Sequence, residues 1–159
     1  MLILNTGGTF NKRYNPLTGE LFVPSDNHAI ETIVRRWIIS STIQGIIFKD
    51  SLEMDDSDRE LLAQTIATAE EKVIIVVHGT DTMDKSAAKV AQMGLDKCVV
   101  FTGAMVPFSV DSIEATANLA MAIGYAANRE NGVYIVMQGV MGSYDRVAKN
   151  KTVGRFDYV

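Results

Sequence analysis

Short apolar runs along the chain alternate with segments in which apolar residues recur every three or four positions. The apolar runs are rich in β-branched residues and apolar on both faces, as strands buried in a parallel sheet tend to be. They predict strands over the ranges Leu2–Asn5, Ile43–Phe48, Val73–Val77, Cys98–Thr102 and Val133–Met137.

The segments between these runs have the spacing of amphipathic helices. Apolar residues from Ile30 to Ile38 form one stripe, with Ser25 and Asp26 before it as candidate caps. The sequence Ser57-Asp-Arg-Glu60 fits a capping box in front of a second stripe. The third stripe comprises Ile113, Ala117, Ala120 and Met121.

The alternation of strands and helices predicts an α/β fold with a doubly wound, flavodoxin-like, mostly parallel sheet flanked by helices. We expect a single domain over residues 1–159, since a domain commonly has about 150 residues. Asn15-Pro16 and Gly19 make residues Gly7–Val23 a mobile hairpin loop in this interpretation. The segment Gly139–Val159 has no strong periodicity.

Composition and charge exclude several classes of function. There are 19 acidic and 15 basic residues, and a net charge of −4 argues against nucleic-acid binding, which needs clustered basic side chains. The single cysteine, Cys98, excludes an internal disulfide and a multi-thiolate metal site. His28 and His78 have no partner at ligand spacing, so we expect no metal.

No apolar run approaches the roughly 18 residues that a membrane span requires, and the apolar start ends at Asn5, too early for a signal peptide. We therefore expect a soluble, cytoplasmic protein without a membrane partner.

Three strands are each followed by glycine and hydroxyl residues. The segments are Thr6-Gly7-Gly8-Thr9, His78-Gly79-Thr80-Asp81-Thr82 and Thr102-Gly103-Ala104-Met105. Doubly wound folds bind ligands just beyond the carboxyl ends of their strands, and glycine lets the backbone approach a ligand closely. The structural alternatives are a tight turn after the first strand and a helix cap at Thr80 or Asp81.

The second of these segments carries the elements of proton-transfer chemistry. Threonine is a poor nucleophile unless a neighbour removes its proton, and a lysine held by a carboxylate can do so. Thr80 and Asp81 supply half of such a unit, and Lys149 is the best candidate for the lysine. On spacing alone, Lys149 is more typical of a solvated surface position.

The segments TGGT, Ser51-Leu-Glu-Met54, HGTDTM and TGAM, in that order, resemble the bacterial-type L-asparaginases. This resemblance extends from Thr6 to about Lys149. It implies hydrolysis of L-asparagine to L-aspartate and ammonia by threonine-based chemistry, with backbone N–H donors at the developing oxyanion and no metal or organic cofactor.

The resemblance also implies catalytic roles. Thr9 matches the nucleophile or activated hydroxyl that faces the side-chain amide, and Tyr14 matches the loop tyrosine that contacts it and closes over the substrate. Thr80, Asp81 and Lys149 match the unit that handles protons.

Substrate-binding roles follow in the same way. Asp81 matches the carboxylate that receives the α-ammonium, Ser51 matches the hydroxyl that binds the α-carboxylate, and Gly79 and Ala104 would add backbone contacts. The chain departs from the family pattern at Leu52, where the family usually has Gln. Typical members also carry a smaller C-terminal domain, so this chain is either a compact relative or a fragment, and we expect a homodimer or homotetramer.

Other functions remain open at this point. Because Leu52 replaces the family's Gln, glutamine or another small ω-amide stays open as an alternative substrate. A third hypothesis is a non-catalytic module that binds an amino acid. Such a module has no use for Thr9, Tyr14 and Lys149 together, which favours the enzyme. A nucleotide-phosphate site is disfavoured because Lys12 and Arg13, the basic residues near TGGT, lie in the loop.

Overall fold

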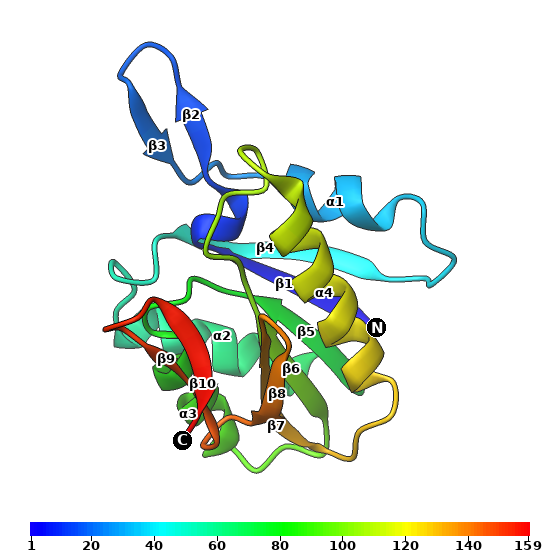
Figure 1. Cartoon of the computed structure of the whole chain (residues 1–159). Coiled ribbons are helices and arrows are strands. Elements are labelled where there is room, and N and C mark those ends of the chain that lie inside the picture. Colours follow the sequence, from blue (N-terminus) through cyan, green and yellow to red (C-terminus); the bar gives the residue numbers. More distant parts are fainter.

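A computed structural model describes all residues, 1–159, and its centre is a six-stranded sheet (Figure 1). The spatial order of its strands is β4-β1-β5-β6-β7-β8, and every neighbouring pair is parallel except β7–β8. The strands are β1 (Leu2–Gly7), β4 (Thr42–Lys49), β5 (Val73–Val77), β6 (Cys98–Thr102), β7 (Gly132–Met137) and β8 (Val140–Ser143). The predicted doubly wound sheet is confirmed, and its topological switch point lies between β1 and β5.

Helices cover both faces of the sheet (Figure 1). They are η1 (a 3₁₀ turn, Thr9–Asn11), α1 (His28–Val34), α2 (Asp56–Thr68), α3 (Met83–Ala91) and α4 (Ser112–Ala126). Helices α1 and α4 pack on one face and α2 and α3 on the other. None of the helices is both long and apolar enough to cross a bilayer.

The sheet is apolar on both faces because each face has its own core. Leu2 and Leu4 of β1 point into the core shared with α2 and α3, whereas Ile3 points into the core shared with α1 and α4. This alternation explains why the strands appear in the sequence as unbroken apolar runs.

Two hairpins lie outside the sheet. The first, β2 (Arg13–Asn15) with β3 (Glu20–Phe22), falls in the predicted hairpin loop and projects from the body of the molecule (Figure 1). The second, β9 (Val147–Asn150) with β10 (Arg155–Tyr158), packs over the same face as α2 and α3. Together with β8 it occupies the segment that showed no periodicity.

The predicted helix details are wrong in three places. Helix α1 ends at Val34, so the stripe does not continue to Ile38, which is fully exposed, and the N-cap is Asn27 rather than Ser25 or Asp26. The capping box of α2 pairs Asp55 with Asp58, two residues before the predicted position, because these carboxylates reach the free N–H groups at the helix start.

The third error concerns α4, whose predicted stripe lies on the wrong side. Ile113 is exposed, and the buried face instead includes Ala115, Asn118, Leu119 and Ala122. Alanine is apolar enough to satisfy either register, so the periodicity of this helix does not select the buried face.

Candidate active site

The loops after β1, β4 and β5 meet at the topological switch point with no room for additional side chains. A Cβ on Gly8, whose φ is +71°, would lie 2.4 Å from the Cα of Gly79. A Cβ on Gly79 would lie 2.6 Å from Ser51 Oγ. Glycine at both positions therefore lets TGGT, the Ser51 segment and HGTDT come into direct contact.

Lys149 bridges the two polar side chains of the HGTDT segment. Its Nζ donates to Thr80 Oγ1 at 2.9 Å and to Asp81 Oδ1 at 2.9 Å. The lysine side chain is 13% exposed and Thr80 is 5% exposed, so water is largely excluded from the contact. Charge-assisted hydrogen bonds of this kind gain strength when they are desolvated. The alternative of a solvated surface lysine is thereby ruled out.

The β9–β10 hairpin brings Lys149 to this position from 69 residues further along the chain than Thr80. Phe156 is the cross-strand partner of Lys149. Phe156 and Val147 are both buried in the core beneath α2 and α3. Since residues i and i+2 of a strand share a face, Val147 and Lys149 both point inward.

Ser51 lies in the turn that follows β4 and is fastened to the HGTDT segment. Its Oγ accepts from the Asp81 amide at 3.3 Å, and its carbonyl oxygen accepts from Thr82 Oγ1 at 2.8 Å. The residue is buried, whereas Leu52 is 70% exposed. The exposed apolar side chain of Leu52 therefore lies next to Ser51, at the position where the family pattern has a glutamine.

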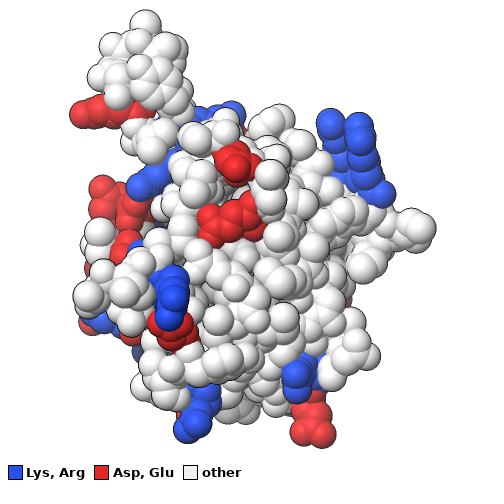
Figure 2. Space-filling view, in the orientation of Figure 1, with Lys and Arg blue, Asp and Glu red and all other residues white.

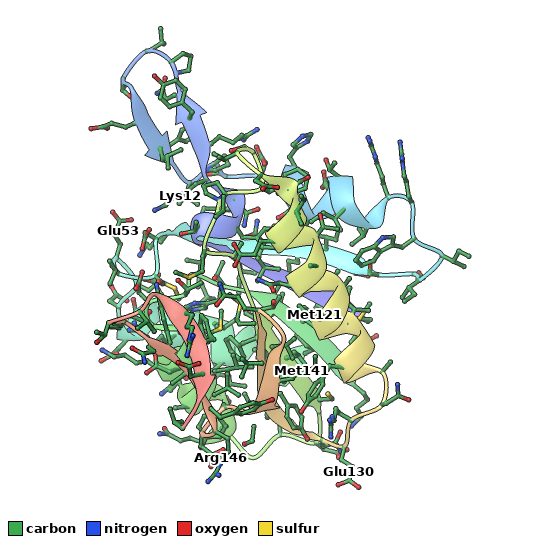
Figure 3. The ribbon with its side chains drawn as sticks, viewed as in Figure 1. Lys12, Glu53, Met121, Glu130, Met141 and Arg146 are labelled. Atoms are coloured by element: carbon green, nitrogen blue, oxygen red, sulfur yellow. The ribbon has the colours of Figure 1, made fainter.

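Sequence reasoning missed an ion pair beside Ser51. Lys12, at the base of the first hairpin, lies 2.6 Å from the Asp50 carboxylate; Figure 3 labels Lys12 and Glu53 on the two facing segments. Burial alone would raise the pKa of Asp50, but hydrogen bonds from Lys12 and the Leu52 amide, with the charge of Lys149, hold it below its usual range. The pair is neutral as a whole and links the base of the first hairpin to the turn that carries Ser51.

Thr9 and Tyr14 are placed differently from each other. Thr9 is half-buried and directly follows Gly8, next to the point where the Gly8 and Gly79 backbones come into contact. Tyr14 is 61% exposed on β2, in the projecting lobe that Figure 2 shows as mostly uncharged. The structure does not bring Tyr14 to Thr9, and closure of the tyrosine over a substrate stays a prediction.

The TGAM segment lies next along the rim, and the amide of Met105 at its end is already bound to a side chain. Ala104 is buried, and the N–H groups of Met105 and Val106 donate to the Glu114 carboxylate at 3.0–3.2 Å. Asn118 donates to the Gly103 carbonyl at 3.0 Å, the hydrogen bond to a neighbouring loop that its apolar surroundings suggest. Glu114 was not identified from the sequence, because a glutamate in the first turn of a helix is common.

No group of three or more His, Cys, Asp or Glu side chains is arranged to hold a metal ion. The acidic residues around Asp55 instead cap α2.

His78 is a buried residue at the start of the HGTDT segment. The ring is fully buried, and its Nδ1 lies 2.7 Å from the Gly79 carbonyl oxygen, while Nε2 has no partner. Burial lowers the pKa of His78 to about 4, because a charged imidazolium would lose its hydration there. The histidine is thus a neutral core residue beside the loop that carries Thr80.

This burial predicts a pH dependence of stability. The unfolded chain protonates His78 near pH 6.5 and the folded chain only near pH 4, so the unfolded state gains protons first as the pH falls. We expect the free energy of unfolding to drop by about 3 kcal/mol between pH 6.5 and pH 4 and to be unaffected by this group above pH 6.5. Denaturant titrations across this range measure the slope.

His78→Gln should remove that slope, whereas the same change at the exposed His28 should preserve it. Equal slopes in wild type and His78→Gln would contradict the assignment.

The chain is similar to known proteins in both sequence and structure. The family model described as "Asparaginase, N-terminal" matches residues 1–157. An L-asparaginase 2 of Escherichia coli is 29% identical over 94% of this chain and 46% of its own length. A subunit of the glutamyl-tRNA(Gln) amidotransferase of Methanococcus maripaludis is 26% identical over 88% of this chain and 35% of its own length.

Solved structures share the fold of this chain. The thermostable L-asparaginase from Thermococcus kodakarensis superimposes with a TM-score of 0.86 at 24% identity, over 99% of this chain and 50% of that one. A probable cytoplasmic L-asparaginase from Campylobacter jejuni gives 0.82 at 25% identity, over 99% and 52%. The chain therefore spans about a third to a half of the length of the relatives it matches.

Proposed function

The chain belongs to the asparaginase family, and from that membership we propose that it hydrolyses the side-chain amide of L-asparagine to L-aspartate and ammonia. The observation that carries the proposal is the contact of Lys149 Nζ with both Thr80 Oγ1 and Asp81 Oδ1. A module that only binds an amino acid needs a carboxylate and a hydroxyl. It has no use for a desolvated lysine directed at a threonine hydroxyl.

In this proposal the substrate's α-groups are bound beside the unit. The Asp81 carboxylate, 34% exposed, receives the α-ammonium, and the Ser51 hydroxyl receives the α-carboxylate. The backbone at Gly79 and Ala104 adds contacts. The amide carbon then faces Thr9, where N–H donors stabilise the oxyanion that forms.

Proton transfer is the task of Lys149 and Thr80. In this step Lys149 acts as the neutral amine: it accepts the Thr80 proton across the 2.9 Å contact while Asp81 holds it in place, and the proton then passes to the departing amide nitrogen, which leaves as ammonia. Two routes use this unit: Thr9 attacks the amide carbon and water later hydrolyses the ester, or water activated at Thr80 attacks directly. Both routes release ammonia and end in aspartate.

We further propose that the chain acts in the cytoplasm as a homodimer or homotetramer. Support for the compartment comes from the Campylobacter jejuni relative, which is described as cytoplasmic. The outward face of α4, with exposed Ile113 and the small residues Ala117 and Ala120, suits close contact between copies.

Glutamine is the second candidate substrate. Leu52 stands exposed where the family pattern has Gln, and several relatives are named as subunits of glutamyl-tRNA(Gln) amidotransferase. Loss of one polar contact to the substrate's ammonium would weaken binding by about 1–3 kcal/mol. This loss affects both amino acids, so the length of the amide arm decides between them.

The test is ammonia release by the purified chain from L-asparagine and, separately, from L-glutamine over a wide concentration range. We expect saturable release from asparagine, with a larger kcat/KM than for glutamine. A larger kcat/KM for glutamine would identify glutamine as the preferred substrate. Absence of ammonia release from both amino acids would reject amide hydrolysis.

A further inference from the structure

A glutamine occupies the tight turn between β7 and β8 in an unusual backbone conformation. Gln138 has a φ of +54°, the only positive φ at a residue other than glycine, and Gly139 follows with +85°. Two successive positive φ values are typical of a type I′ turn, where Asn and Gly are preferred. Glutamine is disfavoured in such a turn, so the contacts of its side chain must account for its presence there.

Both the oxygen and the nitrogen of the Gln138 side-chain amide make hydrogen bonds. Its Oε1 accepts from the backbone N–H of Phe156 at 3.1 Å, and its Nε2 donates to Glu114 Oε1 at 3.3 Å. Its own backbone N–H donates to Asn118 Oδ1 at 2.9 Å. This residue therefore ties β10 to α4 across the end of the sheet.

The bond to Phe156 lies next to the proposed proton-handling unit. Phe156 is the cross-strand partner of Lys149, and its amide donates outward, away from the β9–β10 ladder, to Gln138. Elsewhere the hairpin is anchored by the buried Val147 and by the Tyr158 hydroxyl near the backbone of Met141. At the level of Lys149 it is held by the buried Phe156 side chain and by the Gln138 bond, which fixes the Phe156 backbone to the turn between β7 and β8.

The other end of the amide reaches the TGAM segment. Glu114, which receives Gln138 Nε2, also holds the amides of Met105 and Val106, and Asn118 holds the Gly103 carbonyl. Gln138 thus connects the loop after β6 to the hairpin that carries the lysine. Asparagine, one methylene shorter, would favour the turn but could not span the same gap.

We propose that Gln138 is a positioning residue that acts through Phe156 to hold the β9–β10 hairpin, so that the Lys149 amine stays against Thr80 and Asp81. The kinetic consequence rests on the proposed amide hydrolysis. The placement of the lysine does not, and it can be measured separately.

The kinetic test compares two changes in the same turn. Gln138→Gly removes the side chain but suits a positive φ, so the chain should still fold while kcat falls about tenfold to a hundredfold and KM changes little. Gly139→Asn alters the turn without touching any contact, because nothing lies within 4 Å of a Cβ there, and should keep kcat. Wild-type kcat in Gln138→Gly, or an equal loss in Gly139→Asn, would overturn the proposal.

A second readout needs no turnover. Acylation by an N-hydroxysuccinimide ester, followed by peptide mass spectrometry, gives the labelling rate of Lys149 relative to the exposed Lys151 on the same hairpin. This ratio should rise severalfold in Gln138→Gly and stay at the wild-type value in Gly139→Asn. An unchanged ratio in Gln138→Gly rejects the positioning role. If the wild type releases no ammonia, the proposed function fails and the labelling ratio alone decides the role of Gln138.

Discussion

Thr80→Val is expected to reduce turnover of L-asparagine by about a thousandfold, within the range that positioned proton transfer contributes. Valine keeps the volume and branching of threonine, so it fits the same buried position, but it removes the hydroxyl that accepts from Lys149 Nζ. The Lys149–Asp81 contact remains, and the lysine then has no proton to take. Steady-state ammonia release measures kcat.

The matched control is Thr68→Val on α2, an exposed threonine whose hydroxyl only bonds back to carbonyl groups of its own helix. This variant should keep wild-type kcat. Thermal unfolding of Thr80→Val tests whether the fold is kept. A folded Thr80→Val protein with nearly wild-type turnover would remove Thr80 from the mechanism.

Lys149→Met is expected to lower kcat by about a hundredfold to ten-thousandfold with a smaller change in KM, because the lysine moves a proton rather than holding the substrate. Methionine keeps much of the apolar stem of lysine and its packing beside Phe156. Separate determination of kcat and KM for L-asparagine measures the effect.

Two further variants separate charge from proton transfer. Lys149→Arg keeps the positive charge but cannot give up a proton near neutral pH, so it should be as slow as Lys149→Met. Lys151→Met, at the exposed end of the same hairpin, should be unaffected. Activity in Lys149→Arg close to wild type would mean that the charge alone is needed, and a raised KM with unchanged kcat would assign the lysine to binding.

The central strands could be predicted from the sequence because each has both faces buried. Val73–Val77 and Cys98–Thr102 have the same bounds in the structure as in the prediction. Parallel pairing follows from the alternation with helices, since a parallel strand requires a crossover. The edge of the sheet where the candidate site lies was therefore accessible from pattern alone.

The C-terminal hairpin could not be predicted in the same way. Its strands have four residues each and turn only one face toward the core, and Val147 and Phe156 are too few to establish a period. For α4 the difficulty was the opposite, because its alanines permit two apolar faces. Packing against β5 to β7, a long-range effect, selects the buried one.

The candidate site likewise contains residues with a local sequence signal and residues without one. Residues at strand ends, such as Thr80 and Asp81, can be named as candidates from the sequence, because doubly wound folds bind ligands at this edge of the sheet. Partners that arrive from other elements, such as Glu114 and the Lys12–Asp50 pair, leave no local signature. Gln138 is a partial exception: glutamine before glycine at a predicted strand end is a departure from turn preference that could have been noticed.

The measurement that tests the central claim most directly follows amide-¹⁵N-labelled L-asparagine by NMR with the purified chain. We predict that labelled ammonium and aspartate appear in equal amounts, at a rate that saturates with substrate and is lost in both Thr80→Val and Thr9→Val. No conversion by the wild type, with aspartate still raising its unfolding temperature, would contradict the account and leave a site that binds the amino acid without hydrolysing its amide.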